Sequence, residues 1–202
     1  MKHLVFDRME ECGEAEIRRL LPLVSAQRRE KALLFKHAFG RYACLKTYEM
    51  LQTLLFENRL IPKKETELVF QELAHGKPVL RDFPDIHFNI SHCKNAFAVI
   101  VSKNPVGIDI ESFRPCKSAL LQRTMNAGET ADILASDMPG RRFTEYWTRK
   151  EAVLKLRGCG IAGDLHTVLH GKEFIETHVN EEKRYAFSIA SDYLPQNPVS
   201  LS

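Results

Sequence analysis

The sequence predicts an α+β protein, and three observations support this. Segments with a helical pattern and segments with a strand pattern come in runs, and not in the regular alternation of a βαβ array. Of the 202 residues, 44% are hydrophobic and 27% are charged, which is typical of globular proteins and unlike disordered or fibrous chains. The length suits one large domain or two smaller halves that share a core.

The N-terminal part is expected to hold a strand and then a block of helices. Residues 3–8 (HLVFDR) have a strand pattern. Ser25 is the expected N-cap of the second helix, which carries the basic run AQRREK. Pro62 ends the block, and a strand over 66–71 and a turn at 75–78 follow it. The helices are expected over residues 11–21, 25–38 and 40–57.

The middle of the chain is expected to hold three strands, over residues 86–91, 96–101 and 105–112. The segment AFAVIV (96–101) is apolar at every position, as in a strand that is buried on both faces. Only a short turn, 102–105, separates it from the third strand. We therefore expect the strands 96–101 and 105–112 to pair with each other.

The last part of the chain returns to helices and then to strands. Pro139 and Gly140 separate two helical patterns, and Gly158 with Gly160 ends the second one by C-capping. The helices are expected over 117–137 and 141–157, and closing strands over 165–170, 172–179 and 184–190.

Charge and cysteine content restrict the function. The formal net charge of +3 is too small to indicate a nucleic-acid-binding protein, but it is compatible with an anionic ligand. No apolar run has the length of a membrane span, and charges within the first eleven residues disfavour a secretory signal. The five cysteines form no C-x-x-C pair, so we expect reduced thiols in the cytoplasm and no zinc site.

The segment VGIDIE (106–111) is the first candidate for chemistry. On a strand, Asp109 and Glu111 lie on one face and repel each other, while the alternate residues are apolar. One interpretation is the exposed face of an edge strand. The apolar strand beside it favours another, in which the carboxylates line a cleft and a cation neutralises them. Oxygen ligands next to phosphates favour Mg²⁺.

A second acidic group is expected on the helix 141–157. Each residue turns a helix by about 100°, which puts Glu151 only about 40° from Trp147, at the border of the apolar stripe. An ordinary exposed i,i+4 pair of Glu151 with Lys155 would lie on the polar face instead. Both side chains are therefore candidates for the edge of the same cleft.

Polar and basic residues upstream are candidates for phosphate binding. Ser91 and His92 end the strand FNISH; adjacent strand residues face opposite ways, so His92 is a poor base for Ser91, and phosphate donors suit both residues better. A plain hydrogen-bonded strand end is the alternative. Arg28 and Lys31 near the start of the second helix form either a solvated basic face or a phosphate site.

Together these segments resemble the Sfp-type 4′-phosphopantetheinyl transferases. The matching motifs are GKP (76–78), FNISH (88–92), VGIDIE (106–111) and WTRKEAVLKLRGCGI (147–161), in the order and spacing of that family. The segment SAQRREKALLF (25–35) is similar to the basic helix of the family. The resemblance covers most of residues 25–161.

The resemblance implies a fold and an activity. The family fold consists of two similar α+β halves related by a pseudo-two-fold, here residues 1–102 and 103–202, with the active site in the cleft between them. The implied reaction transfers 4′-phosphopantetheine from coenzyme A to a serine of an apo acyl or peptidyl carrier protein and releases 3′,5′-ADP. Pseudo-symmetric single-chain members are typically monomers.

The resemblance also implies roles for individual residues. The metal ligands for Mg²⁺ would be Asp109, Glu111 and Glu151. Glu151 would also be the base for the carrier serine, and Lys155 would stabilise the leaving group. The residues that would contact the phosphates of coenzyme A are Ser91, His92 and Lys155. Arg28 and Lys31 would bind the 3′-phosphate, and Lys77 would lie near the nucleotide.

Two other functions remain open from the sequence. One is a Mg²⁺-dependent pyrophosphohydrolase of nucleotides, and the other is a non-catalytic module that binds coenzyme A or a carrier protein. For a carrier protein, the segment 112–130 is a candidate docking surface. Arg114 and Lys117 would flank an apolar stripe of Leu120, Leu121 and Met125. The alternative is that the stripe faces the core.

Overall fold

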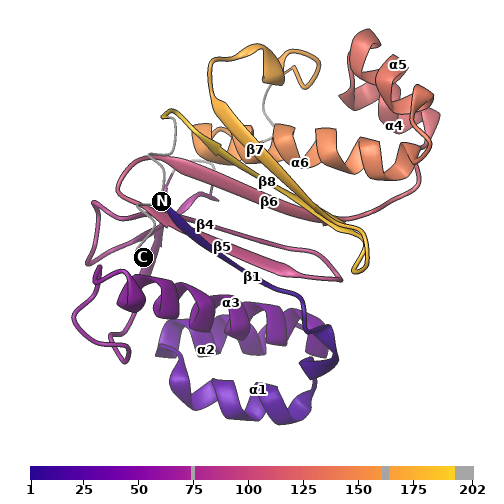
Figure 1. The fold of residues 1–202 in the computed structure, drawn as a ribbon. Coiled ribbons are helices and arrows are strands. Elements are labelled where there is room, and N and C mark those ends of the chain that lie inside the picture. The colour runs from indigo at the N-terminus through magenta and orange to yellow at the C-terminus, as the bar shows by residue number, and fades with distance from the viewer. Residues whose placement is uncertain (74–75, 161–163, 194–202) are drawn as a thin grey trace, which may run out of the picture.

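The computed structural model describes residues 1–73, 76–160 and 164–193, and it contains helices and strands in the mixed order of an α+β protein (Figure 1). The predicted fold class is therefore confirmed at this level. Two three-stranded antiparallel sheets lie between helices on either side. Among the described residues, no helix is both long and apolar enough to reach across a lipid bilayer.

The N-terminal part contains one strand, a block of helices and then four more strands. Ser25 caps α2 as predicted, because its side chain accepts a hydrogen bond from the Arg28 backbone N–H. The elements of this part are β1 (Lys2–Phe6), α1 (Glu14–Leu20), α2 (Ala26–Leu33), α3 (Ala38–Glu57), β2 (Phe70–Glu72), β3 (Pro78–Leu80), β4 (His87–His92) and β5 (Phe97–Ser102).

The C-terminal part begins with a strand, continues through three helices and ends in a hairpin. Gly158, the C-cap of the third helix, has the left-handed φ of +68° that glycine adopts without strain. The elements of this part are β6 (Val106–Ser112), α4 (Ser118–Thr124), α5 (Ala127–Ala135), α6 (Pro139–Arg157), a 3₁₀ turn at Val168–His170, β7 (Phe174–Asn180) and β8 (Tyr185–Ser191).

The two large sheets have the same strand order. In the first sheet β5 lies between β1 and β4, and in the second sheet β8 lies between β6 and β7. In both, the strand that comes last in the sequence is central, and the strand that precedes the helices is at an edge. Strands β4 and β6 are therefore both edge strands, one from each sheet.

The predicted pairing of β5 with β6 is wrong, because β5 pairs with β1 and β4 while β6 pairs with β8. The apolar character of β5 on both faces has another cause. Phe97, Val99 and Val101 pack into the core between the first sheet and α3, whereas Ala98 and Ile100 pack against the second sheet. Helix α3 covers the first sheet on its outer face, with α1 and α2 packed against α3, and α6 covers the second sheet (Figure 1).

The side chains of β6 point alternately to its two faces, with the apolar ones on one face, as the sequence predicts. Val106, Ile108 and Ile110 enter the apolar cluster between the two sheets. Gly107 faces α6 so closely that a Cβ there would collide with the backbone of Ala152 and Leu156. A residue without a side chain is what lets α6 lie directly on this strand.

Two predicted elements of the C-terminal part are wrong. The expected strand 165–170 is a pair of turns, because the Asp164 carboxylate accepts from the His166 backbone N–H and the Asp164 carbonyl accepts from the Thr167 N–H. The expected helix 117–137 is two helices. Asn126 breaks it by accepting from the Glu129 N–H, while the Glu129 carboxylate accepts from the Asn126 N–H, a complete capping box.

The proposed docking stripe on the segment 112–130 is not an exposed surface. Leu121 and Met125 are only 4% and 3% exposed, and they pack with Ile133 and Phe143 in a cluster between α4, α5 and α6. Leu120 packs against the same cluster. The alternative interpretation, a stripe that faces the core, is the correct one.

Candidate active site

Asp109 is the residue at which three elements meet. It lies on β6, is only 4% exposed, and accepts two hydrogen bonds at Oδ1. One comes from Lys155 Nζ on α6, at 2.6 Å, and the other from the hydroxyl of Ser91 on β4, at 2.8 Å. Its second oxygen, Oδ2, is buried and finds no hydrogen-bond partner among the described residues. The sequence predicted that these three residues belong to one site, and the structure brings them together.

The Lys155 ammonium donates to three acceptors within the protein. Besides Asp109, its ammonium donates to the Ser91 hydroxyl at 2.9 Å and to the Ile108 carbonyl at 3.2 Å. An ammonium group has three donors. A phosphate can therefore bind to Lys155 only in exchange for one of these acceptors.

Side chains of β4 take the place of a backbone ladder between β4 and β6. The Ser91 hydroxyl accepts a hydrogen bond from the Ile110 N–H at 3.3 Å, and Asn89 Oδ1 accepts from the Ile108 N–H at 3.0 Å. Asn89 was not predicted from the sequence. Its signal was the two-residue spacing from Ser91, which puts both polar side chains on one face of a strand.

Glu111 lies next to Asp109 on the same face of β6, but its carboxylate is bound elsewhere. Arg114 Nη2 lies 2.7 Å from Glu111 Oε1, and the same guanidinium lies over the Trp147 ring, 5.8 Å from its centroid. Burial raises the pKa of Glu111, and the charge of Asp109 adds to this, while Arg114 opposes it. Arg114, proposed from the sequence as a docking residue, is thus a partner of the site.

Glu151 lies on α6 one turn before Lys155 and is partly buried. Its pKa is raised, first by burial and then by the negative charge of Asp109. A carboxyl group with a raised pKa is a better general base near neutral pH than an exposed one.

The fit of a metal ion to these carboxylates can be judged from the donor set. In the described ranges, no three His, Cys, Asp or Glu side chains gather closely enough to hold a metal ion by themselves. Asp109 Oδ2, however, offers lone pairs that no donor uses. Mg²⁺ is commonly bound by one or two carboxylates together with substrate phosphates, and the residues present fit that mode.

His92 ends β4 and points away from Ser91, as strand alternation requires. Ser91 is buried, whereas His92 is exposed and meets the ring of Phe39, in the first turn of α3, edge to face at 6.3 Å. The ring of Phe97, the residue that pairs with His92 on the neighbouring strand β5, lies at 6.2 Å. His92 is therefore held at the surface beside the start of α3.

Arg28 and Lys31 share α2 but differ in environment. Arg28 Nε donates to the Cys44 carbonyl at 2.8 Å and Nη2 donates to the Thr47 hydroxyl at 3.0 Å, and the guanidinium lies over the Phe70 ring. Burial lowers the pKa of Arg28. Lys31 is exposed. Arg28 thus connects α2 to α3, a role that the sequence did not reveal.

Lys77 caps the C-terminus of α6. Its ammonium donates to the carbonyls of Lys155 and Leu156, at 2.9 and 3.2 Å, and burial lowers its pKa. Cations are favourable at the C-terminus of a helix. A cavity of about 520 Å³ lies beside Lys77, between Leu73, the segment 77–88, Pro105 and the end of α6.

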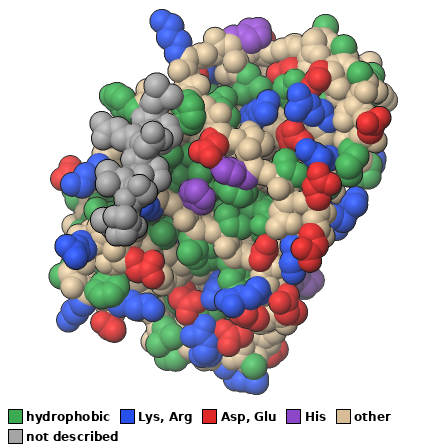
Figure 2. Space-filling model, viewed as in Figure 1, with side chains coloured by type: hydrophobic (Ala, Val, Ile, Leu, Met, Phe, Trp, Pro, Cys, Tyr) green, Lys and Arg blue, Asp and Glu red, His purple; other side chains and the backbone are tan. Residues whose placement is uncertain are grey.

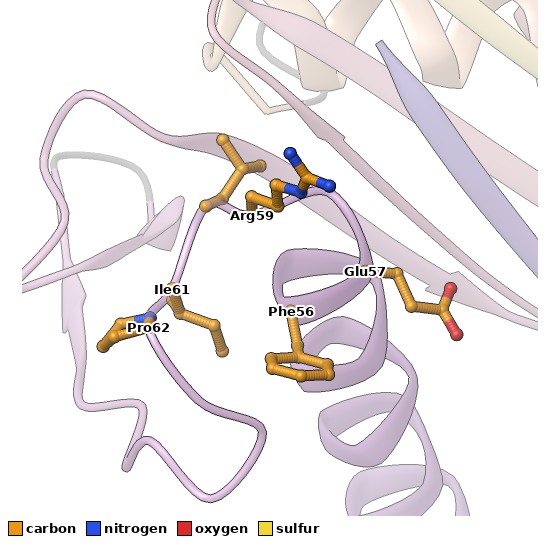
Figure 3. Close-up of a pocket in the computed structure, with 6 residues that line it drawn as sticks. Phe56, Glu57, Arg59, Ile61 and Pro62 are labelled. Atoms are coloured by element: carbon orange, nitrogen blue, oxygen red, sulfur yellow. The ribbon is translucent and has the colours of Figure 1, made fainter.

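The hollow at the end of α3 lacks the cluster of acidic groups found around Asp109. The hollow of about 500 Å³ shown in Figure 3 lies at the C-terminal end of α3, where Phe56 and Ile61 border it and Glu57 is the only acidic residue in its lining. On the face shown in Figure 2, basic and acidic side chains are interspersed over the helical layer, without a large patch of one sign.

Comparisons with known proteins point to one family. A family model described as the 4′-phosphopantetheinyl transferase superfamily matches residues 105–198. The chain is 33% identical over 151 residues to 4′-phosphopantetheinyl transferase psf-1 of Bacillus pumilus, covering 73% of this chain and 63% of that relative. It is 30% identical over 158 residues to a 4′-phosphopantetheinyl transferase of Bacillus subtilis, covering 77% of this chain and 69% of the relative. Sfp of Bacillus subtilis (strain 168) is 29% identical over 152 residues, with 74% and 67% covered.

Proposed function

The chain belongs to the 4′-phosphopantetheinyl transferase superfamily, a family of transferases, and from this premise we propose that it transfers 4′-phosphopantetheine from coenzyme A to a serine of an apo acyl or peptidyl carrier protein. The other product is 3′,5′-ADP. The observation that carries the proposal is the meeting of β4, β6 and α6 at Asp109, where an acid, a lysine and a hydroxyl are in direct contact.

Magnesium is part of the proposal. Asp109 would hold the ion through its unpartnered Oδ2, and Glu111 and Glu151 are the neighbouring carboxylates. Bound there, the ion would neutralise charge on the pyrophosphate of coenzyme A as the leaving group departs. The raised pKa values of both glutamates support an arrangement in which added positive charge is favourable.

Glu151 is the proposed base and Lys155 the proposed stabiliser of the leaving group. Glu151 would accept the proton of the carrier serine, and its raised pKa supports this role. Lys155 would turn one of its donors from Asp109 or Ser91 to the phosphate on which negative charge develops. Ser91 and His92 lie at the adjacent end of β4, from which they would contact the phosphates.

The nucleotide end of coenzyme A would bind to the N-terminal part of the chain. Lys31 is exposed and free to meet the 3′-phosphate, and Arg28 lies on the same helix. Lys77 would place the nucleotide near the end of α6, where the adjoining cavity is lined mainly by apolar side chains. An apolar cavity with a few cations suits a base with attached phosphates.

We further propose that residues 1–102 and 103–202 are two similar halves related by a pseudo-two-fold, with the active site between them. The identical strand order of the two sheets supports this, as does the position of Asp109 where their edge strands meet. Within the same proposal the enzyme acts as a monomer in the cytoplasm. Five free thiols are consistent with a reducing compartment.

Mass spectrometry of a carrier protein tests the proposal. The chain is incubated with coenzyme A, Mg²⁺ and an apo carrier protein, and the carrier is expected to gain the mass of one phosphopantetheine while 3′,5′-ADP appears in equal amount. Chelation of Mg²⁺ should stop both. Release of a nucleotide product with no carrier present would indicate a pyrophosphohydrolase, and binding of coenzyme A without any product would indicate a non-catalytic module.

A further inference from the structure

Lys150 is a fully buried charged residue in the middle of α6. Its side chain is 0% exposed, and its ammonium donates to Glu129 Oε2 on α5 at 2.7 Å and to the Leu165 carbonyl at 2.6 Å. Glu129 is itself buried. The proposed chemistry does not use this ion pair, although Lys150 directly precedes Glu151.

The ion pair belongs to a network that joins three segments. Glu129 Oε2 also accepts from the Asn126 backbone N–H at 2.8 Å, and Asn126 Oδ1 accepts from the Glu129 N–H at 2.9 Å. The Asn126 side-chain amide donates to the His166 carbonyl at 3.2 Å. The start of α5, the middle of α6 and the segment 165–166 are thereby held together by directional contacts.

Stability alone gives no reason for a charged pair at this place. Clusters of apolar side chains lie along α6 on both sides of Lys150, and well-packed apolar residues at buried sites are often as stabilising as an ion pair or more so. Hydrogen bonds, in contrast with apolar contacts, fix direction. The network is therefore suited to setting the rotation of α6 about its own axis.

The opposite side of α6 is hydrogen-bonded to the second sheet. The Thr148 hydroxyl is hydrogen-bonded to the Ser188 hydroxyl on β8 at 2.8 Å, and Lys155 reaches Asp109 on β6. A helix turns about 100° per residue, so a small rotation of α6 moves Glu151 and Lys155 together, away from β6. The helix is thus clamped between the second sheet and the buried ion pair.

We propose that Lys150, through Glu129, is a positioning residue that fixes the rotation of α6 and so the places of Glu151 and Lys155 against Asp109. The functional part of this inference rests on the proposed transferase activity. The geometric part does not, because it concerns the metal-free protein and its own contacts.

The test removes both charges together. Each single substitution would leave the partner charge buried and unpaired, which destabilises the fold. The double variant Lys150→Met with Glu129→Gln keeps both shapes, and the glutamine can still accept from Asn126. As a control, Arg142→Met with Asp132→Asn removes a pair that joins the same two helices at the surface, with Nε 2.7 Å from Oδ2.

For the double variant we expect kcat for phosphopantetheine transfer to fall at least ten-fold, with the KM for the carrier protein unchanged and cooperative thermal unfolding retained. The control variant should keep the wild-type kcat. Lys150→Arg with Glu129→Asp, which restores a pair of similar total length, should recover most of the lost rate. A double variant with wild-type kcat, or a control that loses as much as the double variant, overturns the proposal.

A second readout does not depend on activity. Trp147 is the only tryptophan of the chain and lies on α6, stacked on Phe143 and under Arg114. In the double variant we expect iodide to quench its fluorescence more strongly than in the wild type and in the control. Unchanged quenching overturns the geometric claim. If the wild-type chain transfers no phosphopantetheine while quenching changes as expected, the proposed function fails and the positioning claim stands.

Discussion

The hydroxyl of Ser91 donates a hydrogen bond to Oδ1 of Asp109, 2.8 Å away, and so joins the edge strand of one sheet to the edge strand of the other. The Ser91 hydroxyl oxygen in turn accepts from the Lys155 ammonium and from the Ile110 N–H. From the sequence, Ser91 was expected to contact phosphate. In the structure its hydroxyl contacts Asp109, Lys155 and the Ile110 N–H, which gives it a role in holding Asp109 in place.

Substitution of Ser91 by alanine is therefore expected to weaken the fold as well as the activity. It removes the acceptor of the buried Ile110 N–H and one of the two donors to Asp109 Oδ1, and a buried group left unsatisfied costs about 1–3 kcal/mol. Urea denaturation measures the free energy of unfolding, and Ser91→Thr, which keeps the hydroxyl, serves as control. An alanine variant with wild-type stability but a raised KM for coenzyme A would assign Ser91 to phosphate binding alone.

Asp109→Asn is expected to abolish transfer while the fold is retained. The amide keeps the size of the side chain and a hydrogen-bond acceptor for Ser91 and Lys155, but it removes the charge that the proposed Mg²⁺ requires. Lys155 is partly exposed, so the loss of its partner leaves no fully buried charge. Calorimetric titration of Mg²⁺ in the presence of coenzyme A should show binding to the wild type and none to the variant. Near-normal turnover at saturating Mg²⁺ would refute the metal assignment.

Gly107→Ala is expected to destabilise the protein by about 1–3 kcal/mol, the usual cost of overpacking. The new methyl group would collide with the backbone of Ala152 and Leu156, which cannot rotate aside, and would push α6 with Glu151 and Lys155 from β6. The matched control is Gly128→Ala on α5, where the nearest atom to a Cβ is Asn126 Oδ1 at 3.5 Å. Alanine is the better helix former there, so the melting temperature should hold or rise. Equal effects at both sites would contradict the close packing of α6.

The raised pKa of Glu151 predicts how the stability of the metal-free protein depends on pH. The folded state holds the Glu151 proton more tightly than the unfolded chain, whose carboxyl has a pKa near 4.5. The free energy of unfolding therefore falls as pH rises from 4.5 through the raised pKa. Glu151→Gln removes this contribution, so the wild type should lose stability relative to the variant across that window. Thermal denaturation at each pH, with a chelator present, measures the stability of both proteins. If the stabilities of wild type and Glu151→Gln change with pH in parallel, the pKa of Glu151 is not raised.

Arg28 and Lys31 provide a test of 3′-phosphate binding on one helix. Lys31→Ala should raise the KM for coenzyme A with no loss of stability, because Lys31 is exposed. Arg28→Ala should raise the KM and also lower the stability, since Arg28 holds two acceptors on α3. Dephospho-coenzyme A, which lacks the 3′-phosphate, should be used equally well by wild type and Lys31→Ala. A different rate with this substrate would exclude the 3′-phosphate as the group that Lys31 contacts.

The sequence predicts the local elements of the site well and their partners poorly. The alternation of Asp109 with apolar neighbours and the cap at Ser25 are local patterns, and both appear in the structure. The neighbours of β5 depend on which sheet each strand joins, which periodicity does not encode. Asn89 and Lys77 act on atoms far away in the chain, the Ile108 N–H and the Lys155 carbonyl. Such contacts follow from tertiary packing and leave no mark on local propensity.

The turn 103–105 between β5 and β6 connects two sheets whose strands form no common ladder. What holds them is the apolar cluster around Ile100 and Ile108 together with the side chains of β4. The turn acts as a tether, which raises the effective concentration of one sheet near the other to a level that free fragments in dilute solution do not reach. A chain cut between Lys103 and Asn104 would lose this entropic advantage alone. Each fragment would keep its own three-stranded sheet, and the association of the two fragments would then weaken on dilution.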